Sequence, residues 1–177
     1  MFATIFIPNF FLQAALRHDN GISSSTPIAL IDEQQKKPLI IQLNEAAENT
    51  GVRIGMAPSQ GLARCLELVI KSRSTAKEHA LGNLLLQYAF SLSPNVEATA
   101  PGIWTVEFTR LNNLEAKVTT VVQQLGQCDV IAQAGIAPTP DLSFLAANLG
   151  QPVLQITNPE EFLAPLAVDI LALPFQR

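Results

Sequence analysis

Apolar residues occur along this chain in short runs, and the period of each run indicates either a strand or a helix. Runs rich in β-branched residues predict strands at residues 1–7, 27–32, 38–43, 66–72, 95–98, 103–108, 128–137 and 153–156. Segments with apolar residues on one helical face predict helices at residues 9–17, 44–50, 58–66, 74–90, 112–125, 142–149 and 159–163. Asn9 is the expected cap of the first helix. Strands and helices therefore alternate along the chain.

The strands predicted at residues 27–32 and 38–43 flank a polar segment and indicate an antiparallel hairpin. When this region is set aside, the order of the other elements is that of a split βαβ (ferredoxin-like) fold. Such a fold is an antiparallel sheet with helices packed on one face. We therefore predict an α+β protein whose main domain comprises residues 1–19 and 75–177. Residues 20–74 would form a small inserted subdomain.

Composition places the chain among compact proteins that do not cross a membrane. Of its 177 residues 48% are hydrophobic and only 15% are charged, which is typical of a well-packed globular protein. No apolar run approaches the roughly 18 residues that a membrane-spanning helix needs. The first residues lack the basic lead and the cleavage site of a signal peptide. Cys65 and Cys128 lack metal-ligand spacing, so we expect buried, inert thiols and a cytoplasmic protein.

The charge balance argues against nucleic-acid binding by this chain on its own. Eleven basic residues face fifteen acidic ones, for a net charge of −4. Binding to DNA draws most of its affinity from Lys and Arg that neutralise phosphates. A local basic patch around Arg64, Lys71, Arg73 and Lys77 is one interpretation. The solvated face of a strand and a helix start is the favoured one.

Four segments resemble, in order and spacing, the Y-family (translesion) DNA polymerases. They are PNFFLQAAL, NEAAENTGVRIGM, SPNVEATAPGIWTVEF and the tripeptide Gly135-Ile136-Ala137. The resemblance implies a palm at residues 1–19 and 75–177, interrupted by a fingers subdomain at residues 20–74. In this family a thumb and a little-finger domain follow. The chain ends at LALPFQR, where a thumb would begin, so we expect a piece of a longer protein without those two domains.

The same resemblance implies that the catalytic acids are missing. In the family an opening strand carries two aspartates, and a later strand carries an Asp-Glu pair. These positions fall here on Phe6 and Pro8, and on Gly102 and Ile103. The family's nucleotidyl transfer uses two metal ions, and Mg²⁺ prefers carboxylate oxygens. Since none of these side chains carries an oxygen, we expect no catalytic residue, no metal and no cofactor.

Phosphate binding is expected to be lost as well. The Tyr and Arg that hold the triphosphate in the family fall on Glu45 and Glu48, which would repel it. Prolines and Thr139 occupy residues 138–140, where the family carries a lysine. Phe10 and Phe11 stand where the family has its paired aromatics, the second of which gates against ribose. We expect both rings to serve in the core, and Glu45 and Glu48 to be acids favoured by a helix N-terminus.

A chain that keeps the Y-family fold but lacks its catalytic acids most closely resembles the inactive ImuB-type proteins. That resemblance implies a non-catalytic scaffold in damage-induced (SOS) translesion synthesis and mutagenic DNA repair. Its partners would be a sliding clamp, an accessory protein and an error-prone polymerase, with weak or no DNA binding by this chain.

Two alternatives stay open. One is an active nucleotidyltransferase or DNA polymerase whose metal-binding acids have moved, with Mg²⁺ as its cofactor. Glu97, Glu107 and Asp129 are the acids near the former site, and Glu107 is the one expected to face it. The other alternative is a palm-like domain used purely for assembly, unrelated to repair.

Overall fold

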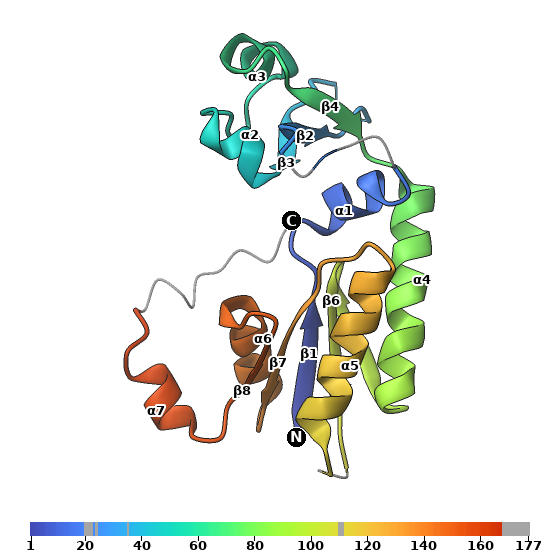
Figure 1. Cartoon of the computed structure of the whole chain (residues 1–177), viewed down its shortest axis with the longest axis vertical. Coiled ribbons are helices and arrows are strands. Elements are labelled where there is room, and N and C mark those ends of the chain that lie inside the picture. The colour runs from blue at the N-terminus through green and yellow to red at the C-terminus, as the bar shows by residue number, and fades with distance from the viewer. Residues whose placement is uncertain (20–22, 24, 35, 110–111, 168–177) are drawn as a thin grey trace. The chain divides into compact units, whose positions relative to one another are not determined.

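The computed structural model describes residues 1–19, 23, 25–34, 36–109 and 112–167 of the chain (Figure 1). Contacts divide the chain into two compact units. The larger unit comprises Met1–Pro8 and the chain from Gly82 onward, and the smaller unit comprises Asn9–Leu81. The position where a thumb was expected to begin lies outside the described residues. The assignment of residues 1–19, 20–74 and 75–177 to subdomains stays a prediction.

The larger unit is built on a five-stranded sheet with the order β5-β6-β1-β7-β8. Its strands are β1 (Phe2–Phe6), β5 (Val96–Ala100), β6 (Ile103–Glu107), β7 (Gln133–Ala137) and β8 (Val153–Gln155). β1 lies in the middle and pairs antiparallel with both β6 and β7, and its three central residues are buried. The order confirms the split βαβ class, to which β8 is added by a parallel pairing with β7.

Helices cover both faces of this sheet, which corrects the expectation that they pack on one face. The larger unit contains most of α4 (Thr75–Leu92), together with α5 (Leu114–Gln127), α6 (Pro140–Leu149) and α7 (Pro159–Leu163). Thr4 of β1 contacts Ser143 of α6, with 2.7 Å between their hydroxyl oxygens. The neighbouring residue Ile5 points to the other face with its cross-strand partner Trp104, beside Gly82 of α4. Figure 1 accordingly shows α6 and α4 on opposite sides of the sheet.

The placement of α6 follows from the parallel pairing of β7 with β8. A parallel pair needs a crossover connection, and α6 is that connection. Small residues let the helix approach the sheet closely. Ser143, Ala146 and Ala147 are fully buried, and Gly135 of β7 lies directly beneath the helix backbone.

The smaller unit contains a three-stranded sheet with the order β3-β2-β4. Its elements are α1 (Phe10–Leu16), β2 (Ile28–Ile31), β3 (Ile40–Leu43), α2 (Glu45–Asn49), α3 (Pro58–Arg64) and β4 (Val69–Ser72). β2 and β3 pair antiparallel, which confirms the predicted hairpin, and β4 joins β2 in parallel. The core beneath this sheet consists of Ala29, Ile31, Ile40, Leu43, Ala47, Val52, Cys65 and Leu68.

Three local expectations were wrong. Asn9 occupies the N-cap position of α1, but its side chain makes no capping hydrogen bond: the residue adopts a left-handed conformation (φ 49°) and its side-chain amide donates to the carbonyl of Leu43. The strand predicted at residues 128–137 forms only from Gln133, because Cys128 ends α5 and Asp129 turns the chain with φ 60°. Cys65 is buried as expected, whereas Cys128 is half-buried with its sulfur 3.6 Å from the hydroxyl of Tyr88. In the part of the chain that the structure describes, no helix has the length and apolar character to cross a bilayer.

Candidate functional site

Most of the residues that the resemblance predicts at the family's catalytic positions meet at one end of β1 and β6. Phe6, the last residue of β1, lies directly opposite Ile103, the first residue of β6. The next residue, Ile7, donates its backbone N–H to the carbonyl of Gly102 over 2.8 Å. Gly102 has φ 81°, a left-handed conformation that suits glycine in the turn between β5 and β6. The fold thus brings together three of the positions named from the sequence, and the fourth, Pro8, comes two residues after the end of β1.

This end of the sheet is apolar. Ile103 is 3% exposed, and the ring of Phe6 meets the ring of Phe144 of α6 edge to face, with 6.3 Å between centroids. Among the described residues, no group of three or more His, Cys, Asp or Glu side chains is placed to hold a metal ion. Where β1 and β6 meet, the resemblance implies carboxylates in the family, whereas this chain has apolar side chains there.

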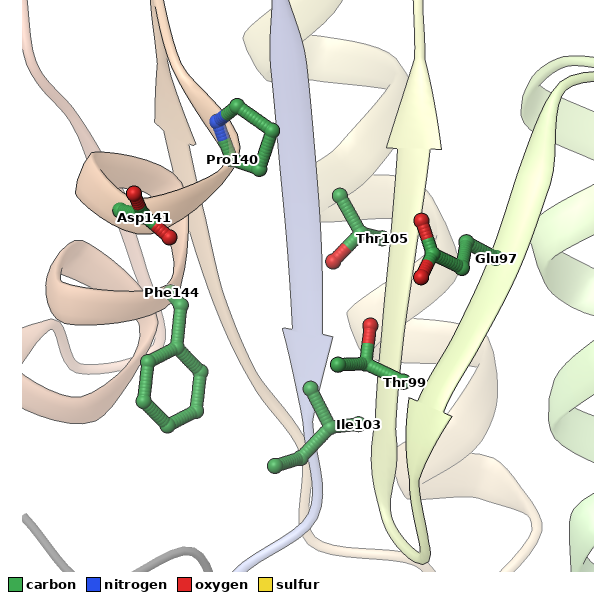
Figure 2. Close-up of a pocket in the computed structure, with 7 residues that line it drawn as sticks. All are labelled: Glu97, Thr99, Ile103, Thr105, Pro140, Asp141 and Phe144. Atoms are coloured by element: carbon green, nitrogen blue, oxygen red, sulfur yellow. The ribbon is translucent and has the colours of Figure 1, made fainter.

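Beside Ile103 the sheet and α6 enclose a hollow of about 210 Å³ (Figure 2). Its lining consists of Glu97, Thr99, Ile103, Thr105, Pro140, Asp141 and Phe144. A line of hydroxyl groups runs behind it. The Thr4 hydroxyl lies 3.2 Å from that of Thr105 and 2.7 Å from that of Ser143, which donates to the carbonyl of Pro140. These contacts fix the wall of the hollow between β1, β6 and the start of α6.

The acids in this hollow are not the one expected from the sequence. Glu107 pairs with Phe2, at the opposite end of β6 from Ile103 and about 13 Å along the strand. It is exposed and does not line the hollow. Glu97 does, because it lies opposite Thr105 at the edge of the sheet. Asp141 also does, and it had not been singled out. The available signal was Thr139-Pro140, a cap followed by a proline at the first helical position, which starts α6 early enough to include Asp141.

In the smaller unit, Glu45 and Glu48 lie exposed in the first turn of α2. Asn44 caps this helix by accepting a hydrogen bond from the backbone N–H of Ala47 (3.0 Å), and it also accepts from Ile28 (2.9 Å). Both glutamates thus stand where the helix dipole favours negative charge. Asn44, which the sequence shares with the family's motif, connects α2 to β2. That Glu45 and Glu48 stand in place of the Tyr and Arg that hold the triphosphate in the family stays a prediction.

Phe10 and Phe11 are both buried, with 4% and 8% of their surface exposed, and their rings meet edge to face at 5.5 Å. The guanidinium carbon of Arg73 lies 4.0 Å from the centroid of the Phe11 ring. This geometry is that of a cation–π contact. One face of the Phe11 ring, which the resemblance predicts at the family's gate position, is therefore covered by Arg73 from within the smaller unit.

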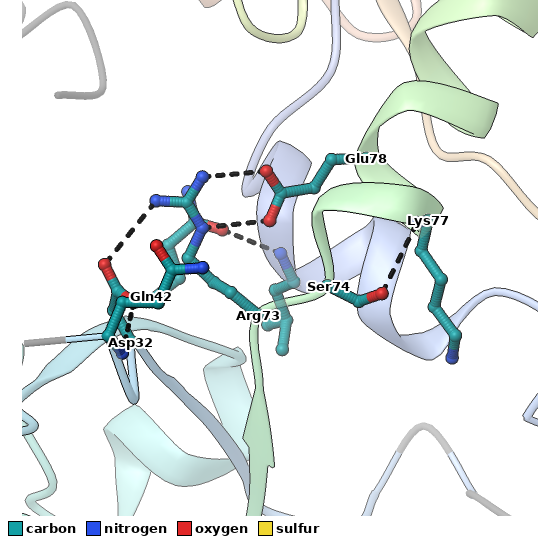
Figure 3. Close-up of polar contacts among 8 residues, drawn as sticks. Asp32, Gln42, Arg73, Ser74, Lys77 and Glu78 are labelled. Carbon is teal, nitrogen blue, oxygen red and sulfur yellow. Dashed lines mark hydrogen bonds and ion pairs between the residues drawn. The ribbon is translucent and has the colours of Figure 1, made fainter.

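Arg73 is held in place by acids (Figure 3). Its Nε and Nη2 atoms donate to the two carboxylate oxygens of Glu78 over 2.9 and 2.7 Å, and its Nη1 lies 3.9 Å from Asp32. The hydrogen bond to Glu78 is the main cause that raises the pKa of Arg73, against the opposing effect of burial. The guanidinium is charged at neutral pH at its ordinary pKa already, and the raised pKa extends the charged range to still higher pH. Its contribution to stability is therefore present at neutral pH and is lost only as the pH rises through that pKa.

The other cations of the proposed basic patch are also engaged. Lys71 forms an ion pair with Asp19 over 2.8 Å, and Lys77 donates to the carbonyl of Ala15 over 2.7 Å. Only Arg64 fits the favoured interpretation of a solvated face, since it is exposed at the end of α3. The residues named from the sequence therefore do not form a free basic surface.

Replacing Arg73 with alanine is expected to destabilise the protein by about 2 kcal/mol, because Glu78, a residue only 8% exposed, would lose the bidentate partner of its carboxylate. Arg73→Lys should lose about half as much, since the charge stays but the fork and the ring contact do not. Urea unfolding followed by circular dichroism measures both. Arg64→Ala is the matched control and should change stability by no more than about 0.5 kcal/mol. Equal losses in Arg73→Ala and Arg64→Ala would contradict this account.

Comparison with known proteins places the chain among relatives of one kind. The model of the impB/mucB/samB family matches residues 5–148. DNA polymerase IV of Yersinia enterocolitica is 25% identical over 167 residues, which are 91% of this chain and 47% of that protein. The structure of DinB from Sulfolobus solfataricus superposes with a TM-score of 0.81 at 16% identity, over 96% of this chain and 53% of that one. A post-insertion binary complex of Dbh DNA polymerase gives 0.82 at 16% identity, over 96% and 52%. The structures share the fold, and the chain spans about half the length of these relatives.

Proposed function

Since the chain belongs to the impB/mucB/samB family and is a Y-family translesion DNA polymerase-like protein, we propose that it works without nucleotidyl-transfer chemistry. Its role is then that of a non-catalytic scaffold in damage-induced translesion synthesis and mutagenic DNA repair. The observation that carries this proposal is the register of β1 and β6, which sets Phe6 directly against Ile103. Two side chains without oxygen stand where the chemistry would need carboxylates.

The physical argument is one of coordination. Two-metal catalysis needs several oxygen ligands that hold two cations about 4 Å apart. Mg²⁺ gives up its water only for ligands such as carboxylates and phosphates. Phe6, Ile103 and Phe144 offer none: the rings of Phe6 and Phe144 contact each other, and Ile103 is the buried cross-strand partner of Phe6. This supports the proposal that the chain retains the fold for a non-catalytic role.

The smaller unit supports the same proposal. Glu45 and Glu48 would face a triphosphate with negative charge, and no bidentate contact replaces the arginine that the family uses there. Arg73 cannot serve in its place without leaving Glu78, whose carboxylate it binds with two hydrogen bonds. The same guanidinium covers one face of Phe11.

The partners proposed for the scaffold follow from the resemblance to ImuB-type proteins: a sliding clamp, an accessory protein and an error-prone polymerase of the cytoplasmic SOS response. We propose that this chain alone binds DNA weakly or not at all. Its net charge of −4 and the pairing of Lys71 and Arg73 with acids support this. Segments beyond this chain would then supply any firm grip on DNA.

Titration of the chain with a deoxynucleoside triphosphate and Mg²⁺ in a calorimeter is expected to release no heat of binding. DNA polymerase IV of Yersinia enterocolitica, titrated in the same buffer, is the positive control. The double variant Glu45→Tyr/Glu48→Arg removes the two repulsive charges and should still show no metal-dependent binding, since the carboxylates remain absent. Metal-dependent heat with the unmodified chain would sink the proposal.

That outcome would support the alternative, an active nucleotidyltransferase with relocated acids. The observation in its favour is that Glu97 and Asp141 both line the hollow beside Ile103. Glu97→Gln and Asp141→Asn would then be the first variants to test, in place of a change at Glu107. With two carboxylates in the hollow, the oxygen donors fall short of what two metal ions need.

A further inference from the structure

The outer edge of the larger unit's sheet is open. β5 is the terminal strand in the order β5-β6-β1-β7-β8, and among the described residues it is hydrogen-bonded only to β6. Glu97, Ala98 and Thr99 at its centre are all exposed. An edge strand of this kind presents unpaired backbone N–H and C=O groups that a further strand can bind. The edge is therefore a candidate for addition of an extended peptide.

The hollow beside this edge is lined, among the residues that the structure describes, by acidic side chains and by no basic one, so its charge favours a cation. Glu97 and Thr99 line it from β5, and Asp141 lines it from the start of α6 (Figure 2). Within the described part of the chain, no hydrogen bond or ion pair engages the carboxylate of Glu97 or of Asp141, and no basic side chain lines the hollow. The two carboxylates thus line the same hollow from opposite sides (Figure 2), and Glu97 does so from the strand with the unpaired backbone edge.

The remaining walls are apolar. Ile103, Pro140 and Phe144 supply hydrocarbon, and Thr99 and Thr105 add hydroxyl groups. A long basic side chain matches this combination, since it lays its methylene stem on apolar surface and keeps its charged head among acceptors. A bare divalent cation would find only two carboxylates and no use for the apolar wall. Nucleic-acid phosphates would be repelled by both acids.

We propose that the β5 edge binds an extended, basic segment of a partner protein, which adds as a sixth strand and inserts an arginine or lysine between Glu97 and Asp141. Backbone hydrogen bonds to β5 hold the segment. The inserted cation sets its register, because residues that alternate along the added strand point to the same face as Glu97 and Thr99. This inference rests on the proposed function, as it names the chemistry of one partner contact of the scaffold.

The test is an NMR titration of the ¹⁵N-labelled chain with a blocked peptide that alternates valine and threonine around a central arginine. We expect shifts of the backbone amides of β5 and of Asp141. A peptide with citrulline, which keeps the shape of arginine without its charge, should bind about threefold more weakly. The variants Glu97→Gln and Asp141→Asn should each weaken binding of the arginine peptide about threefold, and together about tenfold.

Glu107→Gln is the matched control, because Glu107 is an exposed acid of the same sheet outside the hollow. It should leave the affinity unchanged. Equal affinity for the arginine and citrulline peptides, or no shift of β5 with either, would overturn the inference. A second overturning result is that n-butylguanidinium or Mg²⁺ alone reproduces the shifts of the residues that line the hollow, while the peptide leaves β5 unaffected. The hollow would then be a site for a small cation. The nucleotide titration is a separate measurement, so a failed peptide experiment leaves the proposed function standing.

Discussion

Gly135→Ala is expected to destabilise the protein by more than about 3 kcal/mol, a large fraction of the free energy of unfolding of a protein of ordinary stability. A Cβ on Gly135 would overlap the backbone carbonyl oxygen of Ser143 and the backbone nitrogen of Ala147. These are main-chain atoms of α6, so the strain cannot be relieved by turning a flexible side chain. The helix would have to leave β7, together with the buried contact between Thr4 and Ser143. Urea unfolding followed by circular dichroism, or the soluble yield where no fold forms, measures the effect.

Gly126→Ala is the matched control. Gly126 lies inside α5, and a Cβ built there has no heavy atom within 4 Å. Alanine should raise stability by about 0.5–1 kcal/mol, because glycine loses more backbone entropy in a helix. The same exchange is thus expected to have opposite signs at two sites of one unit. A loss of less than about 1 kcal/mol in Gly135→Ala would contradict the close packing of α6 on β7.

The tripeptide Gly135-Ile136-Ala137, which helped to reveal the family, is therefore explained by packing alone. Ile136 and Ala137 are fully buried, and Gly135 admits a helix backbone. A chain of this fold needs these residues to close its core, whether or not it is catalytic. Resemblance carried by such positions therefore indicates the fold and says nothing about activity.

Most elements could be predicted from the sequence because their signals are local. The hairpin of β2 and β3 follows from two apolar runs around a charged turn, and α6 follows a capping threonine and a proline. The meeting of Phe6 with Ile103 could be expected because the resemblance supplied the register. In each case, residues within a few positions or a known frame were sufficient.

Other features depend on contacts between distant parts of the chain. The face on which α6 packs is set by the parallel crossover to β8 and by Gly135, and periodicity does not reveal either. The choice of Glu97 over Glu107 depends on the register of β5 against β6, in which Glu97 meets Thr105 beside the hollow. Asp129 was predicted inside a strand, but it turns the chain in a left-handed conformation that its neighbours do not signal.

Placing carboxylates at Phe6 and Ile103 should give the chain a stabilising response to Mg²⁺ that we do not expect of the unmodified chain. The variant Phe6→Asp/Ile103→Asp sets two acids directly opposite each other in an antiparallel pair, where Cα atoms are about 4.5–5.5 Å apart. Without metal it should be less stable by about 3 kcal/mol or more. Ile103 is 3% exposed, the contact of Phe6 with Phe144 is lost, and two like charges face each other.

Mg²⁺ in about fivefold excess over its dissociation constant should restore about 1 kcal/mol of this loss, because it binds the paired acids only in the folded state. Thermal unfolding with and without Mg²⁺ measures this as a rise in Tm of about 3 °C. Phe6→Asn/Ile103→Asn is the control, since it introduces polar groups of the same size without charge and should show no rise. If Mg²⁺ raises the Tm of the asparagine variant as much as that of the aspartate variant, the two strand positions are not arranged to bind a metal ion. A gain confined to the aspartates would mean that the strands still converge as a metal site requires, and that only the side chains at their ends have changed.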